Sequence, residues 1–173
     1  MVRFFRPRYF SLSRKVSATI LAFTLFIGYF LGSCLAALTV SSFHSLMRSA
    51  LTGSVSIVSL LSVTLLPFLF SAFAVYIRQY WLFLPIALFR CISFSFLGSG
   101  ILYAFGSSGW LICLLFLFSD ILSLPLLCWF WLRHISEGDR HLLRNLSAVF
   151  IVLSGIAILD HQLVSPFLVM LLS

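Results

Sequence analysis

Two charged residues are the first candidates for chemistry, because Arg90 and Asp120 each lie inside a long apolar run. An ionisable side chain in the middle of a membrane costs several kcal/mol unless it is paired or faces water. From the point between Gly106 and Ser107, Arg90 lies about 16.5 residues back and Asp120 about 13.5 forward, so their depths on two antiparallel helices differ by about 4 Å. We therefore predict that they form a buried ion pair.

This pair has two interpretations that the sequence leaves open. Pro85 precedes Arg90 by five residues and Pro125 follows Asp120 by five, so we predict a helix kink at matching depth on each side. Buried charges near broken helices are typical of transporters, which favours a proton or ion pathway. The alternative is a structural pair that fixes how the two helices register.

The composition indicates what must position these residues. Of the 173 residues, 62% are hydrophobic and only 9% are charged. Long apolar runs separated by short polar breaks favour helices, which satisfy their backbone hydrogen bonds internally, over a barrel of alternating strands. The predicted fold class is an all-α, polytopic membrane helical bundle in a single membrane domain that covers residues 1–173.

Basic residues set the predicted topology. We expect about five transmembrane helices, at residues 16–40, 53–77, 80–104, 109–132 and 145–160. Nine basic residues then fall on the cytoplasmic side, in the amino-terminal segment 1–15, the inner loop 133–144 and at Arg78, whereas Arg48 falls outside and Arg90 within a span. This asymmetry predicts a cytoplasmic amino end and an outside carboxyl end. Because the basic residues flank apolar runs, the net charge of +7 does not indicate a nucleic-acid partner.

Small residues recur on two of the predicted helices. Gly28, Gly32 and Ala36 are four residues apart on the first, and Gly98 and Gly100 lie on the third. Such residues allow a neighbouring helix to approach closely, either within the chain or from a partner protein. The four cysteines all lie in apolar stretches without metal-ligand spacing, so we expect no metal and no cofactor.

The turn Gly106-Ser107-Ser108-Gly109 also fits the G-x-S-G pattern of rhomboid intramembrane proteases, with His161 at a similar predicted depth. The chain has too few spans for that family, and His161 lacks its glycine-rich context. Serine and glycine are ordinary residues of a tight turn. We expect no catalytic residues and no enzyme activity.

The stretch 84–127 resembles the core of the stage II sporulation protein M family of bacterial membrane proteins. The matching features are Pro85, Arg90, the run Phe96-Leu97-Gly98-Ser99-Gly100, the turn at 106–109 and the segment from Asp120 to Pro125. The departures are Cys91, where a glycine is expected, a short segment between the first two spans, and a first span that matches only through its paired glycines.

The resemblance implies a five-span protein of the bacterial cytoplasmic membrane. In the sporulation member, the implied role is a non-enzymatic scaffold that anchors peptidoglycan-degrading enzymes at the septum during engulfment. By analogy, we expect a membrane scaffold that organises cell-envelope proteins, with the lipid bilayer and peptidoglycan hydrolases as partners. The alternative is a small transporter subunit or substrate-binding membrane component that uses the Arg90/Asp120 hairpin.

Overall fold

The computed structural model describes residues 14–52, 57–76, 80–137, 142–164 and 166. Six α-helices follow one another in this order: α1 (Arg14–Thr52), α2 (Ile57–Tyr76), α3 (Phe83–Phe105), α4 (Gly109–Phe116), α5 (Phe118–Glu137) and α6 (Leu142–Leu159). Short 3-10 turns precede α3 and α4, and a π-helical turn, η4 (Asp160–Val164), follows α6. The described residues contain no strand, so the all-helical fold class is confirmed.

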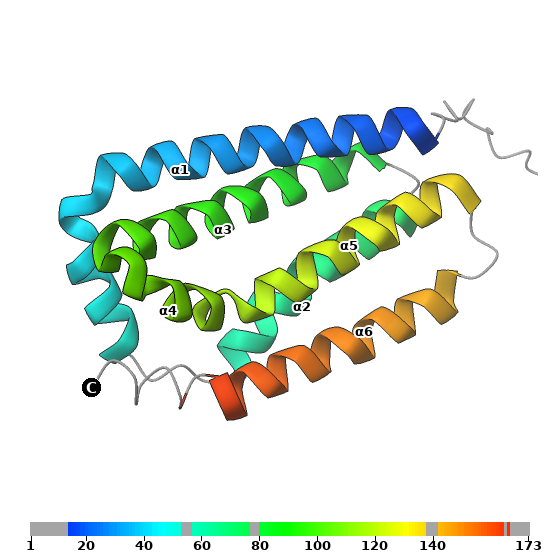
Figure 1. Cartoon of the computed structure of the whole chain (residues 1–173). Coiled ribbons are helices and arrows are strands. Elements are labelled where there is room, and N and C mark those ends of the chain that lie inside the picture. Colours follow the sequence, from blue (N-terminus) through cyan, green and yellow to red (C-terminus); the bar gives the residue numbers. More distant parts are fainter. Residues whose placement is uncertain (1–13, 53–56, 77–79, 138–141, 165, 167–173) are drawn as a thin grey trace, which may run out of the picture.

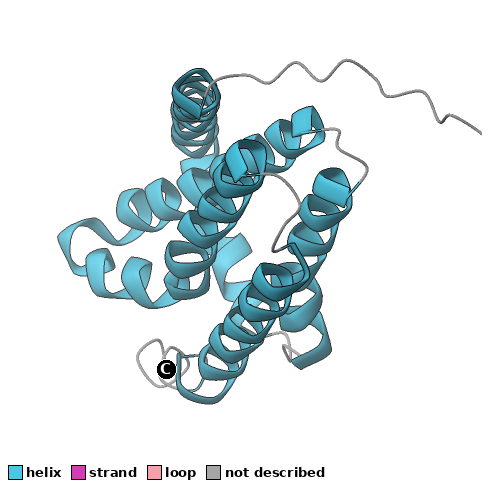
Figure 2. Cartoon of the chain, turned by 90° about the vertical axis from the view of Figure 1, so that its right-hand side faces the viewer, coloured by secondary structure: helices cyan, strands magenta, loops and turns pink. Residues whose placement is uncertain are grey.

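The helices lie side by side and alternate in direction (Figure 1). α1, α3 and α6 run one way, whereas α2 and the α4–α5 pair run back. We call the end that holds the first residues of α1 the proximal end and the opposite end the distal end. Seen from the proximal end, α1 lies at one edge of the bundle and α6 at the other (Figure 2).

Three described helical stretches are long and apolar enough to cross a membrane: Lys15–Phe43, Phe83–Phe105 and Arg144–Gln162. The bent pair of α4 and α5 can serve as a fourth. The described apolar part of α2, Leu65–Tyr76, is shorter than such a span. Length and composition therefore support three or four crossings, and most of the predicted cytoplasmic segment 1–15 lies outside the described residues.

Helix ends differ from the predicted boundaries. The first span was expected to stop at residue 40, but α1 continues to Thr52. No glycine or proline occurs between Cys34 and Thr52, so the polar residues there do not interrupt the helix. The predicted inner loop 133–144 is likewise helical up to Glu137 and again from Leu142.

The prolines do not mark the sharp bend in the helical hairpin, whose first arm is α3 and whose second arm is α4 followed by α5. Pro85 is the third residue of α3, in the first turn, where a missing N–H breaks no helical hydrogen bond. The second arm bends by 49° between α4 and α5, at Leu117, whereas Pro125 lies inside the continuous helix α5. The sharp bend of this arm therefore lies at Leu117, and kinks at Pro85 and Pro125 stay predictions.

Two apolar clusters fill the interior. The proximal cluster takes buried side chains from α1, α2, α3, α5 and α6: Leu21, Phe68, Val75, Phe83, Ala87, Leu127, Phe130, Trp131, Val149, Leu153 and Ile156. The distal cluster is smaller and consists of Phe43, Ile101, Ile112 and Val164. Along α3, Arg90 lies between the residues of the two clusters.

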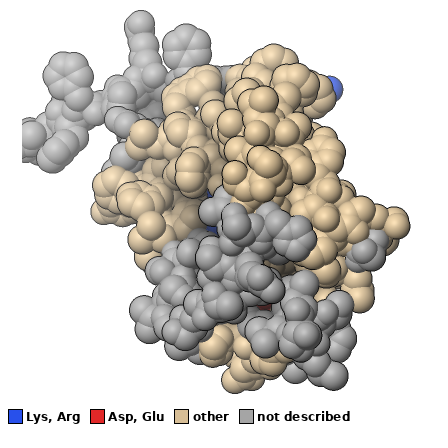
Figure 3. Space-filling model, turned by 90° about the vertical axis from the view of Figure 1, so that its left-hand side faces the viewer, with Lys and Arg blue, Asp and Glu red and all other residues tan. Residues whose placement is uncertain are grey.

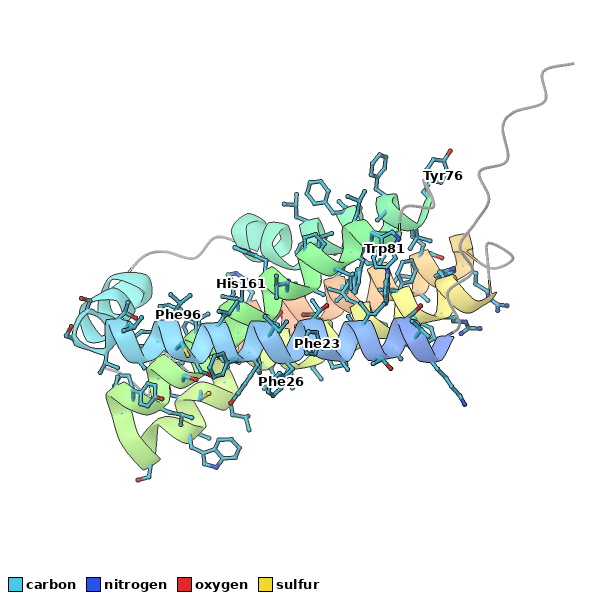
Figure 4. The ribbon with its side chains drawn as sticks, turned by 90° about the horizontal axis from the view of Figure 1, so that it is seen from above. Phe23, Phe26, Tyr76, Trp81, Phe96 and His161 are labelled. Carbon is cyan, nitrogen blue, oxygen red and sulfur yellow. The ribbon has the colours of Figure 1, made fainter. Side chains whose placement is uncertain are left out.

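The outward faces are apolar, as a lipid environment requires. Phe23 and Phe26 of α1 are about two-thirds exposed and project away from the bundle (Figure 4). Tyr76 and Trp81, at the end of α2 and just before α3, are exposed and both lie in the proximal half (Figure 4). Aromatic side chains at such a position are typical of a membrane interface.

Candidate functional site: a buried ionic layer

Arg90 and Asp120 meet in the middle of the bundle. Arg90 Nη1 lies 2.5 Å from Asp120 Oδ1, and the two side chains are 12% and 21% exposed. Arg90 comes from the middle of α3 and Asp120 from the first turn of α5. The pair that residue counting predicts is therefore a direct contact between the two arms of the hairpin.

Asp120 lies just after the bend of the second arm, in the first turn of α5. The bend at Leu117 places this helix start inside the bundle, because α5 begins there and not at the distal turn. Backbone bonds continue through the bend, from Leu117 N to Cys113 O (3.0 Å) and from Ile121 N to Leu117 O (2.8 Å).

Two glycines allow the hairpin to close. Gly106 has φ +61°, a conformation that a residue with a side chain rarely adopts, and it lets the chain leave α3. At Gly98, an added Cβ would lie 3.2 Å from Leu117 Cδ1, so the absence of a side chain lets the bend approach α3. Leu117 is therefore the residue that packs closely at Gly98.

Asp160 and His161 add two ionisable groups near the pair. Asp160 is only 8% exposed, at the start of η4, where the like charge of Asp120 repels it and His161 attracts it. His161 lies in the distal half of the molecule (Figure 4), and its Nδ1 is buried without a hydrogen-bond partner among the described residues. We call Arg90, Asp120, Asp160 and His161 the ionic layer.

The sequence analysis did not include Asp160 in this site, although a signal was present. Asp120 lies 19 residues before Asp139 and Asp160 lies 21 residues after it. On an inner hairpin turning near Asp139, these counts give depths that differ by about 3 Å. Counting residues from a turn, the method that predicts the Arg90–Asp120 pair, therefore also places Asp160 at a depth similar to that of Asp120.

On its other side, α3 is held by α1 through small residues. An added Cβ on Gly28 would lie 2.9 Å from Cys91 Cβ, and one on Gly32 would lie 2.8 Å from Ser95 Cβ and overlap the carbonyl oxygen of Ile92. Ala36 is fully buried. These small residues were predicted to allow close approach either within the chain or by a partner protein, and in the structure they pack α1 against α3 of the same chain. We call this contact the α1–α3 seam.

A directional chain of hydrogen bonds runs through the seam. Ser95 Oγ donates to the carbonyl oxygen of Tyr29 at 2.7 Å. Because a hydroxyl has one proton, Ser33 must then donate to Ser95 (2.8 Å), and Ser99 must donate to Ser33 (3.1 Å). These hydrogen bonds give each of the three hydroxyl groups a partner inside an apolar interface.

Gly100 admits the largest side chain of the distal cluster. An added Cβ there would overlap the ring of Phe43, which is 2% exposed and lies edge-on to Phe96 with ring centroids 5.8 Å apart. The predicted close approach at Gly100 is therefore that of an aromatic side chain from α1.

The chemistry available to this arrangement is electrostatic. Within the described residues, no group of three His, Cys, Asp or Glu could hold a metal ion. Cys91 donates its thiol to the carbonyl oxygen of Leu25 at 3.0 Å. The site can hold opposite charges in an apolar interior and can tie α3 to α5.

The comparisons with known proteins add no family. No family model, no curated protein and no solved structure matches this chain. The resemblance to the sporulation family therefore depends on its motif residues alone.

Proposed function

We propose that the chain is a multi-pass protein of the bacterial cytoplasmic membrane with five crossings, a cytoplasmic amino end and an outside carboxyl end. Three long apolar helices and the bent pair support four crossings, and the reversed direction of α2 supports the fifth. Fusions test the topology. A fluorescent protein should be active on the amino end, and alkaline phosphatase should be active on the carboxyl end. Phosphatase activity on the amino end would contradict the proposal.

Within that membrane, we propose a non-enzymatic scaffold that organises cell-envelope proteins, as in the stage II sporulation protein M family. The observation that carries this proposal is how the matching stretch folds. Its residues meet one another in one hairpin, where Arg90 contacts Asp120 and Gly98 receives Leu117. A hairpin that uses its charges and glycines to hold its own arms is suited to presenting a rigid surface to partners.

The test is affinity purification of the tagged protein from its native membrane in mild detergent, followed by mass spectrometry. The scaffold predicts peptidoglycan hydrolases or other envelope enzymes among the co-purifying proteins. Exchanging the pair as Arg90→Asp with Asp120→Arg restores a contact between opposite charges, so it should retain those partners. Purification without any envelope enzyme, from cells that express such enzymes, would contradict the scaffold.

A second candidate is a small transporter subunit, and the ionic layer favours it. Asp160 and His161 add two ionisable groups to the pair, next to a bent helix and a π-helical turn, which are features of ion pathways. The variant Asp120→Asn separates the two functions. A transporter would lose flux at unchanged abundance, whereas a scaffold would keep its partners or lose abundance.

A further inference from the structure

Exposed aromatic side chains lie at both ends of the bundle. Tyr76 and Trp81 at the proximal end, and Tyr103 and Trp110 beside the distal turn, are each more than half exposed. From Trp81 to Tyr103 the chain advances 22 residues, or about 33 Å at the rise of a helix, which is close to the thickness of the hydrocarbon core of a bilayer. The two sets of aromatic residues are therefore spaced to lie at the two membrane interfaces.

The two ends differ in charge. Among the side chains that the structure describes, the basic residues outside the ion pair are Lys15, Arg133 and Arg144, which lie near the proximal ends of α1, α5 and α6. Seen from the distal end, almost all described atoms are neither basic nor acidic (Figure 3). Both ends therefore present interfacial aromatic residues, but the described basic side chains accompany them only at the proximal end.

The sequence extends this asymmetry to the whole chain. Nine of the eleven basic residues and two of the four acidic ones belong to segments that adjoin the proximal helix ends, at 1–15, 77–79 and 133–144. The remaining charges are two basic and two acidic residues, which cancel. The net charge of +7 therefore belongs entirely to the segments of the proximal end.

Arg133 brings this charge to the depth of the lipid headgroups. Its guanidinium carbon lies 5.2 Å from the centre of the Trp129 ring, and that ring is nearly half exposed. Exposed indole rings at a helix end lie at headgroup level, so the guanidinium stacked on this ring lies there too. Arg133 is four residues before the end of α5 and Arg144 two residues after the start of α6, so their depths differ by about 3 Å.

We propose that the proximal end binds the phosphate headgroups of anionic phospholipids through a surface that combines exposed aromatic and basic side chains. We call this surface the proximal rim; its residues are Lys15, Tyr76, Trp81, Trp129, Arg133 and Arg144. Anionic lipids attract basic residues beside a bilayer, and a guanidinium can donate two parallel hydrogen bonds to one phosphate. The interfacial tryptophans hold the rim at headgroup depth, which favours a lipid over a soluble acidic protein. This binding goes beyond the scaffold function and does not depend on which membrane side the proximal end occupies.

The experiment counts the lipids that stay bound to the full chain. The protein is purified in a mild neutral detergent, mixed with equal amounts of phosphatidylglycerol and phosphatidylcholine, and analysed by native mass spectrometry. Both lipids carry the same acyl chains, so that only the headgroup differs. The natural sequence should retain phosphatidylglycerol over phosphatidylcholine by about tenfold or more. Equal retention of the two lipids would overturn the proposal.

The double variant Arg133→Gln with Arg144→Gln should lower this preference by about fivefold or more, because it removes two charges from the rim. The single variant Arg144→Gln, which changes an exposed side chain, should lower it by about threefold, and it decides the question if the double variant does not purify as a monodisperse protein. The matched control is Arg48→Gln, which removes the same charge from the distal part of α1 and should leave the preference within about twofold. An equal loss in Arg48→Gln and Arg144→Gln would mean that net charge and not the rim selects the lipid, and would overturn the proposal.

The outcome is separate from that of the proposed function. Co-purification of envelope enzymes with a chain that shows no lipid preference would retain the scaffold and remove the lipid surface. A preference for phosphatidylglycerol that depends on the rim, without envelope partners, would retain the lipid surface and remove the scaffold. Capture of an envelope protein through Arg133 and Arg144, without any lipid preference, would make the rim a protein-docking surface and overturn the lipid proposal.

Discussion

Helix α3 is held in two different ways on its two sides. Against α1 it packs through glycine, alanine and serine, with backbones in close approach and a hydrogen-bond chain between them. Against α5 it is held by two charged side chains that are partly exposed. The α1–α3 contact depends on small side chains, whereas the α3–α5 contact depends on a pair of opposite charges. The two contacts should therefore respond to different substitutions.

The difference also indicates where the molecule can change shape. A glycine seam has no alternative arrangement at the same distance, because any shift separates backbones that nearly touch. A long arginine side chain can follow a moving carboxylate over several ångströms and keep its contact. We therefore expect α1 and α3 to act as one unit, and motion to occur between α3 and the α5–α6 side.

The largest effect is expected at the charged contact. Asp120→Ala removes the carboxylate from a mostly buried guanidinium and should lower the free energy of unfolding by about 3 kcal/mol. Membrane abundance and the melting temperature of the detergent-solubilised protein measure it. The double variant Arg90→Leu with Asp120→Leu should recover most of the loss. A double variant as unstable as the single one would show that packing and not charge sets the cost.

The seam is tested by volume alone. Gly32→Ala adds a Cβ that would lie 2.8 Å from Ser95 Cβ and overlap the Ile92 carbonyl, so the helices must separate. We expect a loss of about 2 kcal/mol, as overpacking typically costs, seen as a lower melting temperature. A stability equal to that of the natural sequence would mean that the two helices are farther apart than described.

A smaller effect is expected for the hydrogen-bond chain. Ser95→Ala removes the hydroxyl that links Ser33 to the Tyr29 carbonyl and should cost about 1 kcal/mol, within the range for interhelical bonds in membranes. Thermal melting of the purified protein measures the cost. Thr19→Ala is the control, because that exposed hydroxyl bonds only to Lys15 O of its own helix among the described contacts. Equal losses in both variants would contradict an interhelical role.

The smallest effect is a gain. An added Cβ on Gly155 of α6 meets no atom within 4 Å, unlike one on Gly28 or Gly32. Gly155→Ala should therefore raise the free energy of unfolding by less than about 1 kcal/mol, through helix propensity, and the melting temperature slightly with it. A marked loss of abundance in cells would instead indicate that another helix covers this face, and would end the comparison between open and closed glycines.

The local sequence predicts some contacts and misses others for identifiable reasons. Arg90 and Asp120 could be paired by counting from one tight turn, because both arms are apolar and nearly equal in length. The bend at Leu117 could not be found, since Leu117 is an ordinary helix former and Gly98, against which its side chain lies, belongs to another helix. Pro125, the obvious breaker, lies inside a continuous helix.

The sequence by itself determined the helical class and the candidate charges, because apolar runs and isolated ionisable residues are local properties. Only the tertiary structure decided that the glycines of α1 face α3, that Asp160 lies near Asp120 and His161, and that Phe43 covers Gly100. Each of these contacts joins residues of separate helices, and their meeting depends on helix rotation and tilt. Those angles are set by packing over the whole bundle, and no single segment encodes them.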